Sequence, residues 1–287
     1  MKNILFYGGA SLLSNIWSNY WRDRFNLYLA LNRKWVEIEG TTSIQLSHNL
    51  NNLDIILKNH KIDLVINCTG FTNVEECEIN KDLAYYLNGY LPGKIAKITS
   101  DLKIKLIHIS TDHLFDGKKI KYSENDNLNP LNTYGKSKAL GEQEVIKNDK
   151  NALIIRTNFF GNGPSYKPSF SDAIASYLIL DKKIELFSDV YYTPIHVNQL
   201  ADNVLNLLKI DANGIFNISS NERITKYDFG LMIAKKMNKN QNLVIPIEIE
   251  KKTNLIVRPK DMSLLNNKIK MLTKVDIEPL INQINYL

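Results

Sequence analysis

The chain has 287 residues, of which 44% are hydrophobic and 23% charged, and its formal net charge is +6. A chain of this length can bury a large core, and no apolar run approaches the roughly 18 to 20 residues needed to cross a bilayer. Cys68 and Cys77 are too few for a disulfide framework and wrongly spaced for a zinc ribbon, so we expect no metal site. The lysines are scattered instead of forming a basic stripe, which disfavours nucleic acid and favours an anionic small molecule as the partner.

The chain starts with a buried strand at 3–7, without the longer apolar region and cleavage site of a secretory signal. We therefore expect a cytoplasmic protein. The strand leads through a turn at 8–14 into a helix, and such turns bring the backbone close to the pyrophosphate of a dinucleotide at a helix N-terminus. An ordinary turn that binds nothing is the alternative. The expected cofactor-binding residues of this turn are Gly8, Ser11, Leu12 and Leu13.

A second strand is predicted at 26–31, and the cofactor preference depends on the residues that follow it. Chains that prefer NAD often place an acidic residue there, whereas an arginine can pair with a 2′-phosphate. Asn32 stands where the acid would be, so Arg33 favours NADP, with NAD possible and an exposed surface arginine as the alternative. Five apolar residues further along have helical spacing and predict a packing helix: Leu46, Leu50, Leu53, Ile56 and Leu57.

Three more buried strands, at 63–67, 105–109 and 152–156, alternate with helical segments. This alternation predicts an α/β fold with a doubly wound, Rossmann-like parallel sheet. Ligands of such sheets bind beyond the carboxyl ends of the strands. The segments that begin with Gly8, Thr69, Thr111 and Phe159 all fall at those ends.

The segment after the strand at 105–109 has the residues for proton transfer. Thr111 follows the strand directly, and Asn132 is a helix cap that places Tyr134 and Lys138 on one helical face. A lysine beside a tyrosine should lower the pKa of the phenol from about 10. We therefore expect Tyr134 to exchange a proton while Thr111 holds a substrate oxygen and a cofactor supplies hydride. A Tyr four residues before a Lys is also common on solvated helix faces, so the spacing alone is weak evidence.

From about residue 160 the pattern loosens, and helices at 170–180 and 196–208 alternate with short strands at 183–187 and 214–218. We interpret this part as a smaller substrate-binding portion that is interleaved with the sheet. The expected domains are residues 1–160 for dinucleotide binding, with a return segment near 190–210, and residues 161–287 mostly for substrate binding.

Five motifs occur in a familiar order: NCTGFTNVEECE (67–78), STDHLFDG (110–117), PLNTYGKSKALGE (130–142), IIRTNFFG (154–161) and RPKDMSLLNNK (258–268). With them the chain resembles the extended short-chain dehydrogenase/reductases, most closely the dTDP-4-dehydrorhamnose reductase group. The resemblance implies an NAD(P)H-dependent reductase of a 4-keto group on a nucleotide-activated deoxysugar, in sugar biosynthesis for cell-surface polysaccharides. It leaves a homodimer possible.

The resemblance also implies roles for individual residues. Thr111, Tyr134 and Lys138 would be catalytic, and Lys138 would also hold the nicotinamide ribose. Asn88 stands at a position that the family commonly keeps as Asn, with a surface amide as the alternative. Cofactor would run along Cys68, Thr69 and Gly70. Substrate would contact Thr111, Asp112, Phe159 and Arg258, where Arg258 meets a phosphate or, alternatively, forms a structural salt bridge.

Two departures from the family pattern keep other functions open. Ser11 and Ser14 replace the second and third glycines of Gly-x-x-Gly-x-x-Gly, which supports a non-catalytic nucleotide-binding or regulatory subunit. His113 stands where dehydratases carry an acid after Thr-Asp, so dehydration is disfavoured, and an epimerase remains an alternative.

Overall fold

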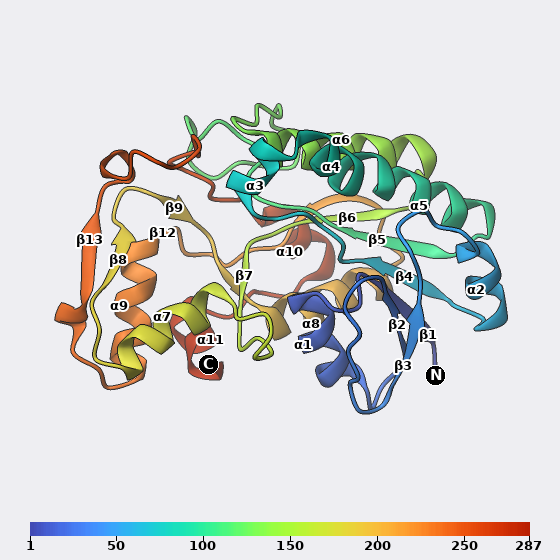
Figure 1. Ribbon diagram of the computed structural model, residues 1–287, viewed down its shortest axis with the longest axis horizontal. Helices are drawn as coiled ribbons and strands as arrows, with labels where there is room; N and C mark the ends of the chain where they lie inside the picture. The colour runs from blue at the N-terminus through green and yellow to red at the C-terminus, as the bar shows by residue number, and fades with distance from the viewer.

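A seven-stranded parallel sheet forms the centre of this computed structural model, which describes residues 1–287 (Figure 1). The strand order is β11-β6-β5-β4-β1-β2-β3, and the order reverses at β1 and β4, where a crevice forms at the carboxyl ends. The predicted parallel sheet is confirmed. Its strands are β1 (Asn3–Tyr7), β2 (Asn26–Leu31), β3 (Thr41–Gln45), β4 (Leu64–Asn67), β5 (Lys105–Ile109), β6 (Leu153–Arg156) and β11 (Gly214–Asn217).

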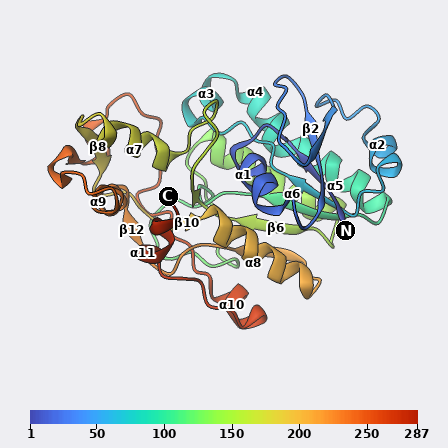
Figure 2. The same cartoon turned by 90° about the horizontal axis from the view of Figure 1, so that it is seen from below.

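Helices cover both faces of the sheet, because successive strand residues point to opposite sides (Figures 1 and 2). On β1, Ile4 and Phe6 enter one hydrophobic core, whereas Leu5 and Tyr7 enter the other. The first core is closed by α1 (Leu12–Trp21), α8 (Val197–Lys209) and α10 (Asn267–Thr273). The second is closed by α2 (Leu53–Asn59), α5 (Leu91–Asp101) and α6 (Thr133–Asn148). The sheet is therefore doubly wound, as predicted.

The helix predicted from the leucines at 46–57 is wrong in its first half. Leu46 directly follows strand β3, which the sequence analysis missed, and its amide donates to the carbonyl of Leu31 at 2.7 Å. Leu50 and Asn52 have φ angles of 64° and 67°, which a helix cannot contain, so α2 begins only at Leu53. The leucines still pack into the core, so the pattern indicated burial correctly and the secondary structure only in part.

The crossover from β4 to β5 passes through α3 (Val74–Ile79), α4 (Lys81–Ala84) and a π-helical turn, η1 (Tyr85–Tyr90), before α5. Asn88 lies in this turn and is fully buried. Its side chain accepts from the Phe71 amide at 2.8 Å and donates to the Phe71 carbonyl at 2.9 Å and to Ser137 at 3.0 Å. The surface-amide alternative for Asn88 is therefore wrong, and the residue joins the segment after β4 to α6.

A smaller lobe follows β6 and has its own core, which includes Ile174, Leu186, Tyr192 and Phe229. Its short strands pair as β7 with β10 and β8 with β13 in parallel, and β9 with β12 in antiparallel. The strands are β7 (Phe159–Phe160), β8 (Ile184–Phe187), β9 (Tyr191–Tyr192), β10 (Ile195–His196), β12 (Ile224–Thr225) and β13 (Val244–Ile247). The helices are α7 (Phe170–Ile179), α9 (Lys226–Lys236) and α11 (Leu280–Gln283), with 3-10 turns η2 (Gln241–Leu243), η3 (Ile249–Lys251) and η4 (Ile284–Tyr286).

The chain returns to the large sheet for longer than the segment expected near 190–210. After α8 it adds β11 beside β6, so the strand predicted at 214–218 lies at the edge of the large sheet and not in the smaller lobe.

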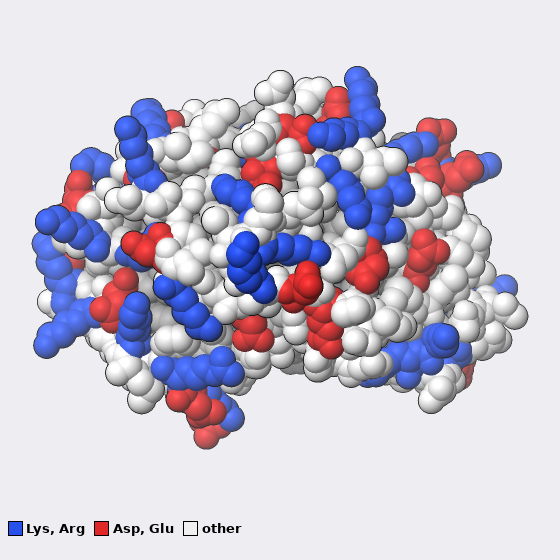
Figure 3. All heavy atoms as spheres, turned by 180° about the vertical axis from the view of Figure 1, so that it is seen from behind, with Lys and Arg blue, Asp and Glu red and all other residues white.

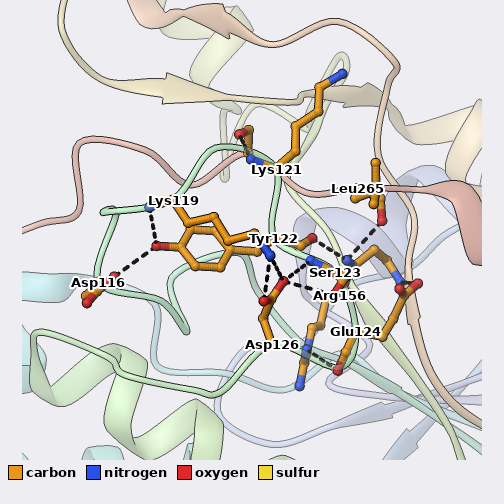
Figure 4. A network of polar contacts seen from close by, with 11 residues as sticks. Asp116, Lys119, Lys121, Tyr122, Ser123, Glu124, Asp126, Arg156 and Leu265 are labelled. Atoms are coloured by element: carbon orange, nitrogen blue, oxygen red, sulfur yellow. Dashed lines mark hydrogen bonds and ion pairs between the residues drawn. The ribbon is translucent and has the colours of Figure 1, made fainter.

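The loop between β5 and α6 is held by the polar network of Figure 4. Tyr122 donates its hydroxyl to Asp116 at 2.9 Å, and its carbonyl accepts from the Leu265 amide at 2.8 Å and from Asn217 at 2.8 Å. Arg156, at the end of β6, donates to the carbonyl of Glu124 at 3.3 Å. The loop that begins at the end of β5 is therefore anchored to two strands of the sheet and to the C-terminal segment.

None of the helices combines the length and the apolar character that crossing a membrane requires. On the face shown in Figure 3, lysine and arginine side chains are interspersed with aspartate and glutamate.

We predict that Gly141→Ala destabilises the protein, although alanine usually stabilises a helix interior by about 1 kcal/mol relative to glycine. A Cβ at Gly141 would lie 2.1 Å from the backbone oxygen of Asn88, and a backbone atom cannot move away as a side chain can. Overpacking costs about 1–3 kcal/mol, and the 2.1 Å approach places this change at the upper end of that range, so we expect a net loss of up to about 2 kcal/mol in urea denaturation. Gly70→Ala is the control, because its nearest contact would be 3.4 Å. Equal stability of wild type and Gly141→Ala would contradict this packing of α6 on η1.

Candidate active site

A groove of about 880 Å³ runs along the carboxyl ends of the central strands. It brings together all of the predicted catalytic and cofactor-binding residues. Of the predicted substrate-binding residues, Thr111, Asp112 and Phe159 line it, whereas Arg258 does not. The predicted residues that line it are Gly8, Ser11, Leu12, Leu13, Arg33, Cys68, Thr69, Gly70, Thr111, Asp112, Tyr134, Lys138 and Phe159.

The altered glycine turn keeps the shape that a dinucleotide requires. Gly8 has a φ of 86°, and a Cβ there would lie 2.7 Å from the Thr69 hydroxyl, so this position needs glycine. Ser11 instead has ordinary extended backbone and caps α1 by accepting the Ser14 amide at 3.1 Å. Ser14 donates its hydroxyl to the Gly8 carbonyl at 2.7 Å. The two serines therefore close the turn, and the other amides of the first helical turn remain available to an anion.

Small residues after β4 form the floor of the groove. The Thr69 hydroxyl is buried and has no hydrogen-bond partner, which is costly unless a ligand supplies one. Burial raises the pKa of the Cys68 thiol to about 12, which disfavours the reactive thiolate. The orphaned hydroxyl and the free helix amides both fit a bound dinucleotide.

The charges that line the groove favour an anionic ligand. Four cationic residues contribute to the lining, namely Arg33, Lys34, Lys138 and Lys167, and Asp112 is the one carboxylate. Arg33 follows β2, as predicted, and it lies near His48, whose pKa is lowered by burial and by the Arg33 charge. The groove thus has a cationic mouth at the end of β2 and a mixed-charge end at Tyr134.

Helix α6 presents Tyr134 and Lys138 to the groove. Asn132 caps the helix by accepting the Gly135 amide at 2.9 Å, as the sequence predicted. Lys138 donates to the carbonyl of Ile109, at the end of β5, at 2.7 Å. Only 9% of Tyr134 and 4% of Lys138 are exposed, so the solvated-face alternative is wrong.

The proton affinities of this pair differ from the sequence prediction. Burial raises the pKa of Tyr134 well above its ordinary value, and the Thr111 hydroxyl opposes this rise only in part. The Lys138 ammonium, which donates to the Ile109 carbonyl, does not offset this effect of burial on the pKa of the phenol. Burial also lowers the pKa of Lys138 to about 8, and the Glu142 carboxylate opposes this change. The phenol therefore keeps its proton at neutral pH, which suits a proton donor.

A buried ion pair lies one helical turn beyond Lys138. Glu142 accepts two bonds from the Nε of Arg156 at 3.0 and 3.1 Å and one from Nη2 at 2.7 Å. Ser110 donates to the same carboxylate at 2.6 Å. This network joins α6 to the ends of β5 and β6, and thereby positions Thr111 beside Tyr134.

Several polar groups gather around Asp112, at the end of the groove next to the smaller lobe. Asp112 is 1% exposed, and its carboxylate accepts from the side-chain amide of Asn158 at 2.7 Å. The His113 ring packs edge-on against Tyr134 with 5.4 Å between centroids, and its Nδ1 is buried without a partner. The hydroxyl of Tyr192 is also buried and unpartnered, and its ring lies 3.3 Å from the ammonium of Lys226. Burial lowers the pKa of Lys226 to about 8, an effect that the Asp112 carboxylate opposes.

Sequence reasoning missed Asn158, Tyr192 and Lys226. Asn158 stands within the motif IIRTNFFG and could have been found there, and Tyr192 lies in the return segment expected near 190–210, whereas Lys226 belongs to no motif. Arg258 forms an ion pair with Glu75 at 2.6 Å, so its structural alternative is present. Its Nε is buried without a hydrogen-bond partner.

Comparison with known proteins places the chain in a family. The family described as RmlD substrate binding domain matches residues 1–285. The chain belongs to this family. The resemblance to the dTDP-4-dehydrorhamnose reductase group is thereby confirmed.

Among its relatives, the probable low-salt glycan biosynthesis reductase Agl14 of Haloferax volcanii is 35% identical over 193 residues, which are 66% of this chain and 64% of that protein. The match therefore spans slightly less than two thirds of that relative. A structure of a hypothetical dTDP-4-dehydrorhamnose reductase from Sulfolobus tokodaii is 30% identical, with a TM-score of 0.84 over 99% of both chains. The dTDP-4-dehydrorhamnose reductase of Bacillus anthracis, in complex with NADP, shares the fold with a TM-score of 0.83 over 99% and 98% of the two chains, at 21% identity.

We predict that the stability of wild type relative to Lys138→Met rises with pH. The folded pKa of about 8 is below the ordinary 10.5, so under pH 8 both folded and unfolded states are protonated and the folded state bears the buried charge. Between about pH 8 and 10.5 the folded state has released a proton that the unfolded state keeps, so wild type gains stability there. Chemical denaturation of both proteins across this range measures the difference. A constant difference would show that folding leaves the pKa of Lys138 unchanged, and a falling difference would show that folding raises it, so either result would contradict the prediction.

Proposed function

We propose that this protein is an NAD(P)H-dependent reductase that reduces a 4-keto group on a nucleotide-activated deoxysugar, in the biosynthesis of a cell-surface polysaccharide sugar. The observation that carries the proposal is the convergence of Thr111, Tyr134 and Lys138 at one end of a groove with a cationic mouth. Membership of the RmlD family supports the same reaction class.

In the proposed reaction, reduced nicotinamide supplies the hydride. The Thr111 hydroxyl holds the substrate carbonyl, and the Tyr134 phenol donates a proton to the oxygen as it gains charge. A phenol that stays protonated at neutral pH is in the correct form for this step. Lys138, fixed by the Ile109 carbonyl, would hold the nicotinamide ribose beside the phenol.

The sugar would lie between Tyr134 and the smaller lobe. Asp112 can accept hydrogen bonds from sugar hydroxyls, whereas Lys226 and Tyr192 can donate to them. Phe159 gives an apolar surface in the groove, and we infer that the guanidinium of Arg258, which lies near His113 and Lys226, would meet a substrate phosphate. Buried polar atoms without partners at this end are explained if substrate supplies the missing bonds.

The non-catalytic alternative rested on the serines that replace two glycines. The hydroxyls of Ser11 and Ser14 hold the turn closed, so the replacement gives no structural reason to prefer a binding-only protein. Failure of the protein to bind either NADPH or NADH would favour that alternative and contradict the proposed reductase.

We predict that NADPH binds roughly tenfold more tightly than NADH, because the guanidinium of Arg33 can form charge-assisted hydrogen bonds with a 2′-phosphate. Arg33→Ala should remove most of this difference and leave NADH affinity nearly unchanged. Titration calorimetry with both cofactors measures the effect, and Arg24→Ala, outside the groove, is the control. Equal affinities of the unmodified protein for the two cofactors would contradict the preference for NADP.

We predict that Tyr134→Phe lowers kcat on a 4-keto nucleotide sugar by roughly 10² or more, with little change in cofactor affinity, because only the proton donor is lost. Steady-state kinetics and cofactor titration of the same variant separate the two effects. Tyr90→Phe, at a tyrosine that is 51% exposed, is the control and should retain kcat. Near-normal turnover of Tyr134→Phe, with chemistry rate-limiting, would move the donor elsewhere, first to His113.

A further inference from the structure

The segment at 161–168, here called the 161–168 loop, reaches from the smaller lobe to the mouth of the cofactor groove. It joins β7 to α7, and its Tyr166 and Lys167 line the groove. In Figure 1 it runs beside α1, the helix whose N-terminus borders the groove. The Tyr166 hydroxyl accepts from Asn15 of α1 at 3.3 Å, and the Tyr166 ring lies 3.8 Å from the ammonium of Lys34. Two contacts therefore connect the lobes across the groove.

The 161–168 loop has a defined shape of its own. Asp172 forms a capping box with Ser169 at the start of α7, and its carboxylate also accepts the Gly163 amide at 2.8 Å. A turn within the loop is closed by the Lys167 amide, which donates to the Pro164 carbonyl at 2.8 Å. A Cβ at Gly163 would lie 2.6 Å from Leu12, so the loop packs on the first turn of α1. The capping interactions at the start of α7 therefore fix the position of the loop over the groove.

Positive charge is in excess where the 161–168 loop meets the groove. Arg33, Lys34 and Lys167 all line its mouth, and the one carboxylate in the lining, Asp112, lies at the Tyr134 end. The ammonium of Lys34 rests on the ring of Tyr166, and its three N–H donors allow it to bind a phosphate at the same time. Three cations that line the groove, two after β2 and one from the 161–168 loop, favour a ligand with several negative charges.

We propose that the 161–168 loop is a clasp for the cofactor, in which Tyr166 holds Lys34 over the groove and Lys167 faces it, so that both ammonium groups bind phosphates of a nicotinamide dinucleotide. The inference rests on the proposed function, since it assumes that a dinucleotide occupies the groove. It adds that the smaller lobe contributes directly to cofactor binding and that release requires the Tyr166 contact to open. The clasp slows dissociation of the cofactor and strengthens binding through its phosphates.

Dissociation rates of reduced cofactor test the clasp directly. Trp17, Trp21 and Trp35 lie in or near the nucleotide-binding elements, so energy transfer from tryptophan to bound NADPH or NADH gives the signal, and excess oxidised cofactor displaces it in stopped flow. Tyr166→Ala should raise the dissociation rate of NADPH roughly tenfold, which is the size expected for a partly desolvated cation–aromatic contact. Tyr166→Phe keeps the ring and loses only the bond to Asn15, so its rate should rise by roughly twofold.

A further variant tests the charge of Lys34, and variants of two exposed residues are the controls. Lys34→Met should raise the NADPH dissociation rate roughly tenfold and make binding less sensitive to salt. Tyr177→Ala, at a tyrosine that is 47% exposed on α7, and Lys182→Met, at another exposed residue, should leave both rates unchanged. Thermal unfolding verifies that each variant is folded.

The outcomes separate the clasp from the proposed function. If the unmodified protein binds NADPH but folded Tyr166→Ala and Lys34→Met release it at the wild-type rate, the clasp is wrong and the reductase proposal stands. If the unmodified protein binds neither NADPH nor NADH, both are wrong. A faster release in Tyr166→Ala and Lys34→Met, with unchanged controls, supports the clasp.

Discussion

The buried ion pair between Glu142 and Arg156 fixes the geometry on which the candidate active site depends. Both side chains are 2% exposed, and removing charges from water costs several kcal/mol per ion unless their bonding is nearly complete. Here three nitrogen–oxygen contacts and the Ser110 hydroxyl complete the carboxylate. Glu142 lies one turn beyond Lys138, and Ser110 directly precedes Thr111. The ion pair therefore fixes the position of α6 relative to the end of β5. The loss of either partner would leave a buried charge at the base of the site.

Burial shifts the pKa values of the two proton-exchanging groups in opposite directions. These shifts determine which group holds its proton at neutral pH. Burial disfavours the phenolate of Tyr134 and the ammonium of Lys138 alike, so the phenol keeps its proton while the lysine holds its charge less firmly. A neutral phenol beside a hydroxyl is arranged to give a proton to a carbonyl oxygen. The sequence suggested the opposite shift in the pKa of Tyr134, because spacing on a helix shows that two side chains share a face but not how deeply the phenol is buried.

The sequence predicted those features that local pattern determines. Continuous apolar strands such as Leu64–Asn67 were found because both of their faces are buried, and the groove residues were grouped correctly because parallel strands end at one edge. Strand β3 was missed because Thr41–Gln45 has one large apolar residue and lies at the edge of the sheet. Tyr192 and Lys226 could not be found, since their place near Asp112 depends on how the smaller lobe folds back on the sheet.

The serine-containing turn shows which part of a glycine-rich motif is a physical requirement. Within this turn, only Gly8 combines a left-handed φ with a neighbouring backbone too close for a Cβ. Ser11 occupies an ordinary extended conformation, where a side chain costs nothing and its oxygen satisfies an orphan amide of α1. Ser14 is fully buried, and its hydroxyl satisfies the Gly8 carbonyl, so a polar atom that would be costly alone stabilises the turn. A motif that departs from the glycine pattern at two positions can therefore keep the approach that pyrophosphate needs, because that approach depends on one glycine and on the direction of the helix amides.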